Sequence, residues 1–502
     1  MSSVIQVQTR PRQRSALIWL APVQAGAVFT VIAATAGGQI LRAWLLGGLF
    51  WLMALPLLVS LEAGLVAMVL FEPFRGLIRR AQYLLVDYAS QDPIHLLTPI
   101  VTLFAFALLV RSRRLDIFHS TPLAAAVSFL GLIYLIEIFN PLQGSLLVGL
   151  GGALFMFVPL LWFYFGQSVN EEFITKILKL TVLLGLVTSF YGVYQMVSGY
   201  PAFEQYWVDN TDFYNSINVG HVRRALATFS SAEEWGRYTE FGAIAAFGFA
   251  AGAKRLAMRL GWLGCGAGLL GAVLLTGERT AVFGLMLGVA AFVLLGATSM
   301  PRALVRLGVL LLPVVLVMVF VSPPTDDEMW SKGEHETVAT LLSHTQRGTL
   351  KPASEESFQI RLENWTYLLT SVVPYRPLGA GIGAGSLSEL RFDQRSNLPP
   401  IDSFILVVAI SCGIPGALLF MWILGRATWL SLALAIRAPS DHPNMISRRI
   451  VAALMPALLL NSVFGLTFTL YSVAPLAWLL IGWISAETMS RRREVEREII
   501  TI

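Results

Sequence analysis

The sequence predicts an all-α, polytopic integral membrane protein. Of its 502 residues, 56% are hydrophobic and only 13% are charged, whereas soluble domains carry about 25% charged residues. Apolar runs recur almost from end to end, and most approach the roughly 20 residues that a helix needs to cross the hydrocarbon core. The net charge of +5 comes mainly from arginines in short loops. That pattern indicates membrane topology rather than a nucleic-acid surface.

The apolar runs predict about 12 to 14 transmembrane helices. They lie near residues 16–36, 41–57, 58–72, 95–111, 121–138, 145–165, 174–198, 236–252, 260–276, 279–297, 303–322, 401–424, 447–464 and 467–486. The first lacks a convincing cleavage site, so we expect it to stay as a signal anchor. Pro56 interrupts the run at 41–72, which leaves two short crossings or a tilted re-entrant pair open.

Basic residues set the predicted orientation. They precede the first span, follow the last and fall on alternate loops. This pattern predicts a protein of the bacterial inner membrane with both termini on the cytoplasmic side. Arg75, Arg79 and Arg80 are then left on the outer face, and we expect segment 73–94 to lie along the membrane as an amphipathic helix. Both long polar segments share that side, so the working surface is predicted to face outward.

Four regions follow from this topology. They are N-terminal transmembrane helices (1–173), further helices with a first periplasmic loop at 199–235 (174–322), a large, partly helical periplasmic loop (323–400), and C-terminal helices with a cytoplasmic tail (401–502). Cys265 and Cys412 both fall in predicted spans, which favours apolar packing over a disulfide.

Polar groups gather at the outer ends of the predicted helices. One helical face carries Tyr191, Tyr194 and Gln195, because they are spaced by three and four residues. They are predicted either to contact the substrate or to belong to an interfacial aromatic belt. Arg223 and Arg224 follow in the first loop, where paired arginines bind anionic groups specifically or lipid headgroups without specificity.

Two further groups carry charge next to the membrane. Glu278 and Arg279 form a tight outer hairpin, and such residues must pair, sit at the interface or face a wet cavity, because burial in lipid costs several kcal/mol. Arg361 and Trp365 lie one turn apart on a predicted helix of the large loop. The glycine run 377–385 that follows either brings backbone N–H groups to a phosphate or lets the loop fold back.

Asp402 opens an apolar helix directly after the longest polar segment. This position places a carboxylate where headgroups and water meet, which favours proton chemistry or ligand binding over packing. The sequence lacks the His and Cys spacing of a zinc site and the glycine-lysine pattern of a nucleotide-binding loop. Neither a metal nor a cofactor is therefore predicted.

Five segments between residues 174 and 425 resemble motifs of the O-antigen ligase and polymerase superfamily. Tyr191–Gln195 resembles the segment before that family's first large loop. Arg224–Phe229 is similar to its Arg-x-x-Gly-x-Phe, with Ala227 replacing the glycine. Thr276–Arg279 is similar to its Thr-Gly-Ser-Arg turn.

The other two segments belong to the large loop and the helix after it. Arg361 to Gly381 resembles the family's Arg…Trp…Pro-Leu-Gly-x-Gly, and Asp402–Gly416 resembles the ligase pattern His-[Asn/Ser/Gln]-x9-Gly-x-x-[Gly/Thr/Tyr]. Asp402 stands where ligases carry the histidine proposed as catalytic. This departure favours a polymerase of an exopolysaccharide system.

The resemblance implies a metal-independent membrane glycosyltransferase whose donor is an oligosaccharide on undecaprenyl pyrophosphate. Arg224, Arg279 and Arg361 would hold the diphosphate, and Asp402, or secondarily Glu278, would accept the proton of the attacking hydroxyl. Expected partners are the lipid-linked glycan, membrane lipids, a chain-length regulator and export machinery, and no nucleic acid. Two alternatives stay open: a ligase that transfers to lipid A core or another acceptor, and a lipid-linked oligosaccharide transporter.

Overall fold

The computed structural model describes residues 40–85, 92–210, 218–219, 222–297, 299, 301–308, 312, 356–385, 398–437 and 445–500. Within these ranges seven helices are long and apolar enough to cross a membrane: Leu41–Val59, Pro93–Ser112, Leu146–Gly166, Glu171–Ser198, Leu256–Leu275, Phe404–Ile436 and Met445–Phe464. The predicted class, an all-α multi-pass membrane protein, is confirmed. The span at 16–36, most of the span at 303–322 and most of loop 323–400 lie outside the described residues.

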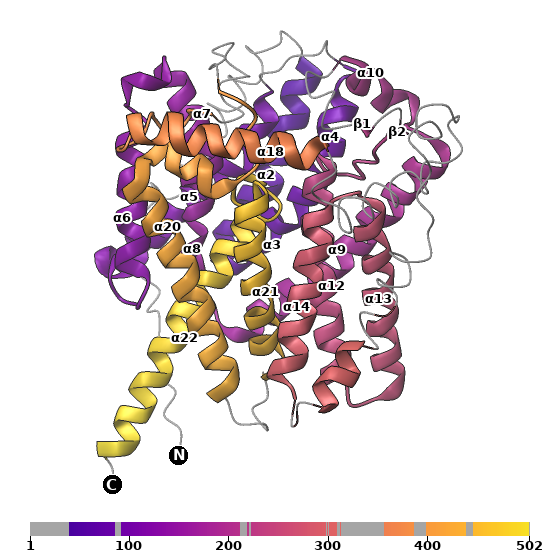
Figure 1. Ribbon diagram of the computed structural model, residues 1–502, viewed down its shortest axis with the longest axis vertical. Coiled ribbons are helices and arrows are strands. Elements are labelled where there is room, and N and C mark those ends of the chain that lie inside the picture. Colours follow the sequence, from indigo (N-terminus) through magenta and orange to yellow (C-terminus); the bar gives the residue numbers. More distant parts are fainter. Residues whose placement is uncertain are drawn as a thin grey trace.

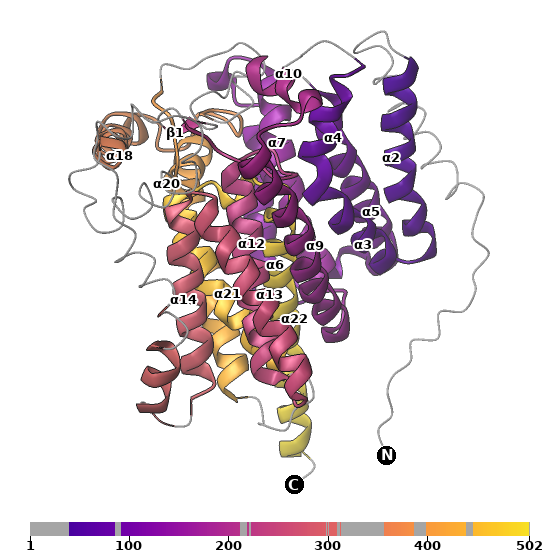
Figure 2. The same cartoon turned by 90° about the vertical axis from the view of Figure 1, so that its right-hand side faces the viewer.

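The first part of the chain, up to Gly166, consists of helices (Figures 1 and 2). Its α-helices are α2 (Ile40–Val59), α3 (Leu61–Phe71), α4 (Arg75–Gln82), α5 (Leu97–Arg113), α6 (Ala124–Glu137), α7 (Leu146–Leu160) and α8 (Trp162–Gly166). The run 41–72 forms two helices, because α2 continues through Pro56 and the side chain of Ser60 then caps α3 by accepting from Ala63 N at 3.0 Å.

The second part of the chain, from Glu171 on, contains further α-helices and two short strands. Its elements are α9 (Glu171–Ser198), α10 (Ala202–Asn210), β1 (Asn218–Val219), β2 (Val222–Arg223), α12 (Ala232–Gly252), α13 (Leu256–Leu275), α14 (Arg279–Leu295), α18 (Glu356–Tyr367), α20 (Phe404–Arg437), α21 (Met445–Phe464) and α22 (Ala474–Ile500). The two-residue strands pair antiparallel. Helix α18 lies across the upper end of the bundle in Figure 1, near the end that carries α10, β1 and β2. We call this end the polar end.

Helix α4 differs from the expected membrane-surface helix. All three of its arginines are buried, and each pairs with an acidic side chain: Arg75 with Glu72 at 2.9 Å, Arg79 with Asp92 at 3.5 Å and Arg80 with Glu204 at 2.6 Å. A buried guanidinium is tolerated only when it is paired and hydrogen-bonded. These three arginines are the basic residues that the positive-inside rule placed on the outer face. Through Arg80 and Glu204 they join the N-terminal helices to the first loop.

The glycine run at 377–385 supplies hydrogen-bond donors to helix α20 where that helix is interrupted. Within α20, Gly413 leaves helical geometry with φ 71° and ψ −177°, and the N–H of Ile414 donates to Pro377 O at 2.9 Å instead of to Ile410 O. Pro415 has no N–H for Ser411 O. Both freed carbonyls accept from the run, Ile410 O from Ala380 N at 2.8 Å and Ser411 O from Gly381 N at 3.1 Å.

The other N–H groups between Gly379 and Ala384 are also used, those of Gly379 and Ala384 by Arg376 O and Gly381 O, both at 2.9 Å. Ile382 N donates to Glu137 O at 3.2 Å and Gly383 N to Gln143 Oε1 at 3.0 Å. Of the two interpretations of the glycine run, the structure therefore supports the one in which the loop folds back onto the bundle. The N–H groups from Gly379 to Ala384 are bonded within the protein and are not available to a phosphate.

We predict that Gly413→Ala strongly destabilises the protein. The backbone conformation at Gly413 is essentially restricted to glycine, and an added Cβ would overlap Pro377 O, so the strain alone should cost about 1–3 kcal/mol. The measurement is the thermal unfolding midpoint of the detergent-solubilised protein. Gly425→Ala, on the same helix with open space around its Cβ, is the matched control and should leave the midpoint unchanged or slightly raised.

Candidate functional site

The candidate site lies at the polar end, where several segments far apart in sequence meet. Side-chain contacts join the first loop to the α13–α14 turn and α18 to the start of α20. A backbone hydrogen bond joins the start of α20 to the turn after α21, and Figure 1 shows α18 lying across this end of the bundle. Five residues form the core of the site, and we call them the polar centre: Arg224, Glu278, Arg361, Trp365 and Asp402.

The first loop is shaped by a buried amide on α9. Gln195 accepts from Leu226 N at 3.2 Å and donates to Ala227 O at 3.2 Å and to Glu204 at 2.8 Å. Ala227 has a positive φ of 49°, the conformation that glycine adopts most readily. This explains why the family pattern has glycine here. The loop is thereby held in one shape, and Arg224 is directed toward the α13–α14 turn.

Arg224 binds this turn by three contacts. Its Nε and Nη2 donate to Thr276 O at 3.1 and 2.8 Å, and Nη2 also pairs with the Glu278 carboxylate. Burial raises the pKa of Glu278, but the charge of Arg224, followed by those of Arg237 and Arg361, outweighs burial and lowers it below 4.5. Glu278 is therefore ionised at neutral pH, and guanidinium groups from three separate segments act on it.

The second ion pair joins α18 to the start of α20. Arg361 Nε donates to Asp402 Oδ2, and Trp365 Nε1 donates to Oδ1 at 2.9 Å. Trp365 is itself stacked on Phe464, with ring centroids 5.6 Å apart. The side chains of Arg361 and Asp402 are 30% and 36% exposed, against 12% and 19% for Arg224 and Glu278. The Arg361–Asp402 pair is thus the open part of the polar centre.

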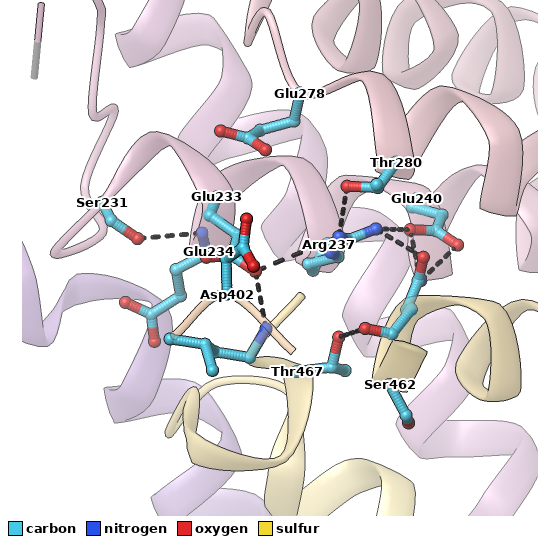
Figure 3. A network of polar contacts seen from close by, with 12 residues as sticks. Ser231, Glu233, Glu234, Arg237, Glu240, Glu278, Thr280, Asp402, Ser462 and Thr467 are labelled. Atoms are coloured by element: carbon cyan, nitrogen blue, oxygen red, sulfur yellow. Dashed lines mark hydrogen bonds and ion pairs between the residues drawn. The ribbon is translucent and has the colours of Figure 1, made fainter. Parts of the chain in front are cut away.

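Next to Glu278 and Asp402 lies a buried network that the sequence analysis did not identify (Figure 3). Arg237 on α12 is fully buried and donates to Asn461 and Thr280. Its guanidinium lies 3.9 Å from Glu233 and 3.6 Å from Glu240. The sequence feature that could have identified this network is a pair of charged residues, Arg237 and Glu240, three positions apart in an apolar helix. Charged groups at such depth in a membrane helix mark functional or pairing sites.

This network connects three helices and a turn. Asn461 on α21 donates to both carboxylate oxygens of Glu240 at 2.9 Å, and Glu233 accepts from Leu466 N at 3.0 Å. Phe404 N donates to Gly465 O at 3.0 Å, which fixes the start of α20 beside the same turn. The helices next to the polar centre are therefore held together by hydrogen bonds.

The other predicted site residues take different positions. Arg279 is the first residue of α14 and is half-buried next to Glu278. Arg223 is exposed and pairs with Asp209 at 2.9 Å, so it is not brought to the polar centre. Gln195 is buried and holds the first loop. Tyr194 is exposed and stacks on Tyr191, with centroids 5.9 Å apart.

The polar centre has the chemistry to bind an anionic group beside a carboxylate. Guanidinium forks match phosphate oxygens, and one carboxylate oxygen accepts more than one hydrogen bond. Asp402 precedes the first turn of α20, where the helix dipole favours negative charge. In the part of the chain that the structure describes, no group of three His, Cys, Asp or Glu side chains is arranged to hold a metal ion.

These features define a polytopic membrane protein with an arginine- and carboxylate-lined centre at one end of its bundle. A family model described as O-antigen ligase matches residues 265–421, which include the α13–α14 turn, α18 and the start of α20. Over these residues the match supports a relation to the O-antigen ligase and polymerase superfamily and indicates an enzyme of the glycan-transfer type. The resemblance inferred from the motifs is confirmed. No curated protein matches the chain.

We predict that Glu278→Gln lowers thermal stability most at neutral pH. Because the folded-state pKa of Glu278 is lowered, its ionised form stabilises the protein above the ordinary pKa of 4.5, and this contribution is lost as the pH falls through the folded-state value. The measurement is the unfolding midpoint of both proteins between pH 7 and pH 3. The difference should be constant down to about pH 5 and shrink below it. A difference that grows toward acid pH would contradict the assigned direction.

Proposed function

We propose that the protein is a polysaccharide polymerase of the bacterial inner membrane. It transfers a glycan from undecaprenyl pyrophosphate to a hydroxyl of another lipid-linked repeat unit, in an exopolysaccharide system. The polar end faces the periplasm and both termini are cytoplasmic, as the loop arginines indicate. The proposal rests on two arginine–carboxylate pairs at the polar end, Arg224 with Glu278 and Arg361 with Asp402, which come from segments far apart in the sequence.

The convergence of these arginines suits the departure of a lipid pyrophosphate. When the anomeric carbon leaves its phosphate oxygen, negative charge grows on the diphosphate, and preorganised cations stabilise it. Arg224 is held by Thr276 O and Glu278, so its position does not depend on substrate. Arg279, adjacent to Glu278, is proposed as a third cation. The activated donor supplies the driving force for the transfer.

Asp402 is proposed as the base that takes the proton of the acceptor hydroxyl. Oδ1 and Oδ2 each accept one bond from the protein, and the exposed carboxylate keeps further lone pairs for the hydroxyl. Glu278 suits this role less, because its pairing with Arg224 lowers its pKa and weakens it as a base. In this chain a carboxylate would thus replace the imidazole of the ligase pattern.

A ligase is the second candidate function. It would use the same donor and transfer the glycan to lipid A core or to another acceptor. The match of residues 265–421 to a model described as O-antigen ligase favours it, and the aspartate at position 402 favours the polymerase. The two differ in which lipid-linked intermediate accumulates when transfer stops.

We predict that Arg224→Ala abolishes polymer in cells, because loss of one preorganised donor costs about 100- to 1,000-fold in rate. A polymerase variant should accumulate single repeat units on the lipid carrier, whereas a ligase variant should accumulate long chains. The readout is the length distribution of extracted lipid-linked glycans, with membrane insertion checked by immunoblotting. Arg223→Ala, whose guanidinium pairs with exposed Asp209, should keep most of the product. Normal polymer in Arg224→Ala would refute the assignment.

We predict that Asp402→Asn slows transfer by the purified protein about 100-fold or more, since a positioned base contributes about 10²–10⁴-fold. The amide keeps an acceptor for Trp365 but does not take up a proton. The assay measures transfer from a synthetic oligosaccharide on undecaprenyl pyrophosphate to a lipid-linked acceptor. Turnover close to that of the wild type would assign Asp402 to structure instead of proton transfer.

A further inference from the structure

The two ion pairs of the polar centre differ in how firmly they are held. Arg224 is bonded to Thr276 O as well as to Glu278, and both side chains are largely covered. Arg361 pairs with Asp402 through its Nε–H, and about a third of each side chain is exposed. This bond uses one of the five N–H donors of the guanidinium. Ion pairs this exposed stabilise a fold little and exchange partners readily.

The backbone around Arg361 is anchored so that its side chain can move alone. Trp365, one turn later on α18, is stacked on Phe464 and bonded to Asp402. After Tyr367 the helix widens into a π-helical turn, Leu368–Val372, whose first and last side chains are buried. Such turns occur frequently at functional sites. Because Trp365 and this turn hold α18 in place, a change of partner by Arg361 requires movement of its side chain and not of the helix.

The two pairs are also joined through α12. Glu278 packs against Gly236 of α12, and Phe404, two residues after Asp402, donates to Gly465 O in the turn whose Leu466 N–H donates to Glu233 of the same helix. In keeping with this arrangement, the charge of Arg361 contributes to the lowered pKa of Glu278. A diphosphate placed beside Arg224 would therefore stand close to Arg361. It carries more negative charge than a carboxylate and offers several oxygens to a guanidinium fork. We propose that binding of the donor's pyrophosphate draws Arg361 away from Asp402, and that this exchange of partners releases the carboxylate for catalysis. This inference rests on the proposed function.

The exchange couples donor binding to base activation. With Arg361 moved, Oδ1 of Asp402 still accepts from Trp365, and Oδ2 is left to accept the acceptor's proton. The hydroxyl oxygen then bonds to the anomeric carbon, and the bond from that carbon to the phosphate oxygen breaks. Its electron pair leaves with the lipid pyrophosphate, whose added charge Arg361 now faces. Without donor, Asp402 stays paired and does not activate hydroxyl groups.

The exchange makes a prediction that a purely structural or purely attractive role for Asp402 does not make. Because Asp402 competes with pyrophosphate for Arg361, Asp402→Asn should bind undecaprenyl pyrophosphate more tightly, although it transfers glycan poorly. We expect Kd to fall about 3- to 10-fold in Asp402→Asn and to rise about 10-fold in Arg361→Gln. In the double variant, the added Asp402→Asn change should alter Kd less than about 2-fold.

The experiment measures binding of undecaprenyl pyrophosphate to the full-length protein in nanodiscs of uncharged lipid. Arg376→Gln, an exposed arginine on the same segment, is the matched control and should leave Kd unchanged. Unaltered or weaker binding by Asp402→Asn, or an equal gain in the Arg361→Gln background, would overturn the exchange while wild-type transfer leaves the proposed function standing. Absence of saturable binding to the wild type would overturn the donor and the exchange together.

Discussion

The pairing of guanidinium groups with carboxylates inside an apolar bundle is the constraint on which this structure depends. A charge within a membrane protein is tolerated only if partners replace its water. Arg237 lies between Glu233 and Glu240 on one helix and reaches Thr280 and Asn461 on two others. Arg75, Arg79 and Arg80 play the same part in the N-terminal half. These pairs determine which helix ends meet, and so where the polar centre forms.

The structure combines a rigid base with an open upper layer. Hydrogen bonds from the turn at Gly465 and Leu466 join α20, α21 and α12 below the polar centre. Above them, Arg361 and Asp402 are the most exposed of the charged groups in the centre. An enzyme of the glycan-transfer type needs both properties. Cations for the leaving group must be preorganised, while access for two large substrates must stay open.

Much of the site was predictable because motif residues lie at helix ends. Topology alone places the α13–α14 turn, the first loop and the start of α20 at one end of the bundle. Arg224, Glu278, Arg361 and Asp402 were accordingly identified from the sequence, and the structure brings them together. The separation of Arg223 from Arg224 was not predictable, because it depends on how β2 packs against α10.

Partners of buried charges were harder to predict than the charges themselves. Arg237 and Glu240 are visible as charged residues in an apolar run, but their bonds to Asn461 depend on the packing of α12 against α21. The three arginines of α4 were noticed only as an exception to the topology rule. Their acidic partners, Glu72, Asp92 and Glu204, lie in separate segments, the last of them in the first loop. No sequence periodicity relates these arginines to their partners. Pairing over such separations is a property of the fold.

The interrupted helix α20 has a consequence for exchanging parts between relatives. Ala380 and Gly381 donate to carbonyls that Gly413 and Pro415 leave without helical partners. The end of the large loop and the membrane helix therefore form one hydrogen-bonded unit. Grafting the loop of a relative without its matching helix would leave the carbonyls of Ile410 and Ser411 without hydrogen-bond partners inside the bundle. Chimeras made to alter glycan choice should have their junction beyond Gly416.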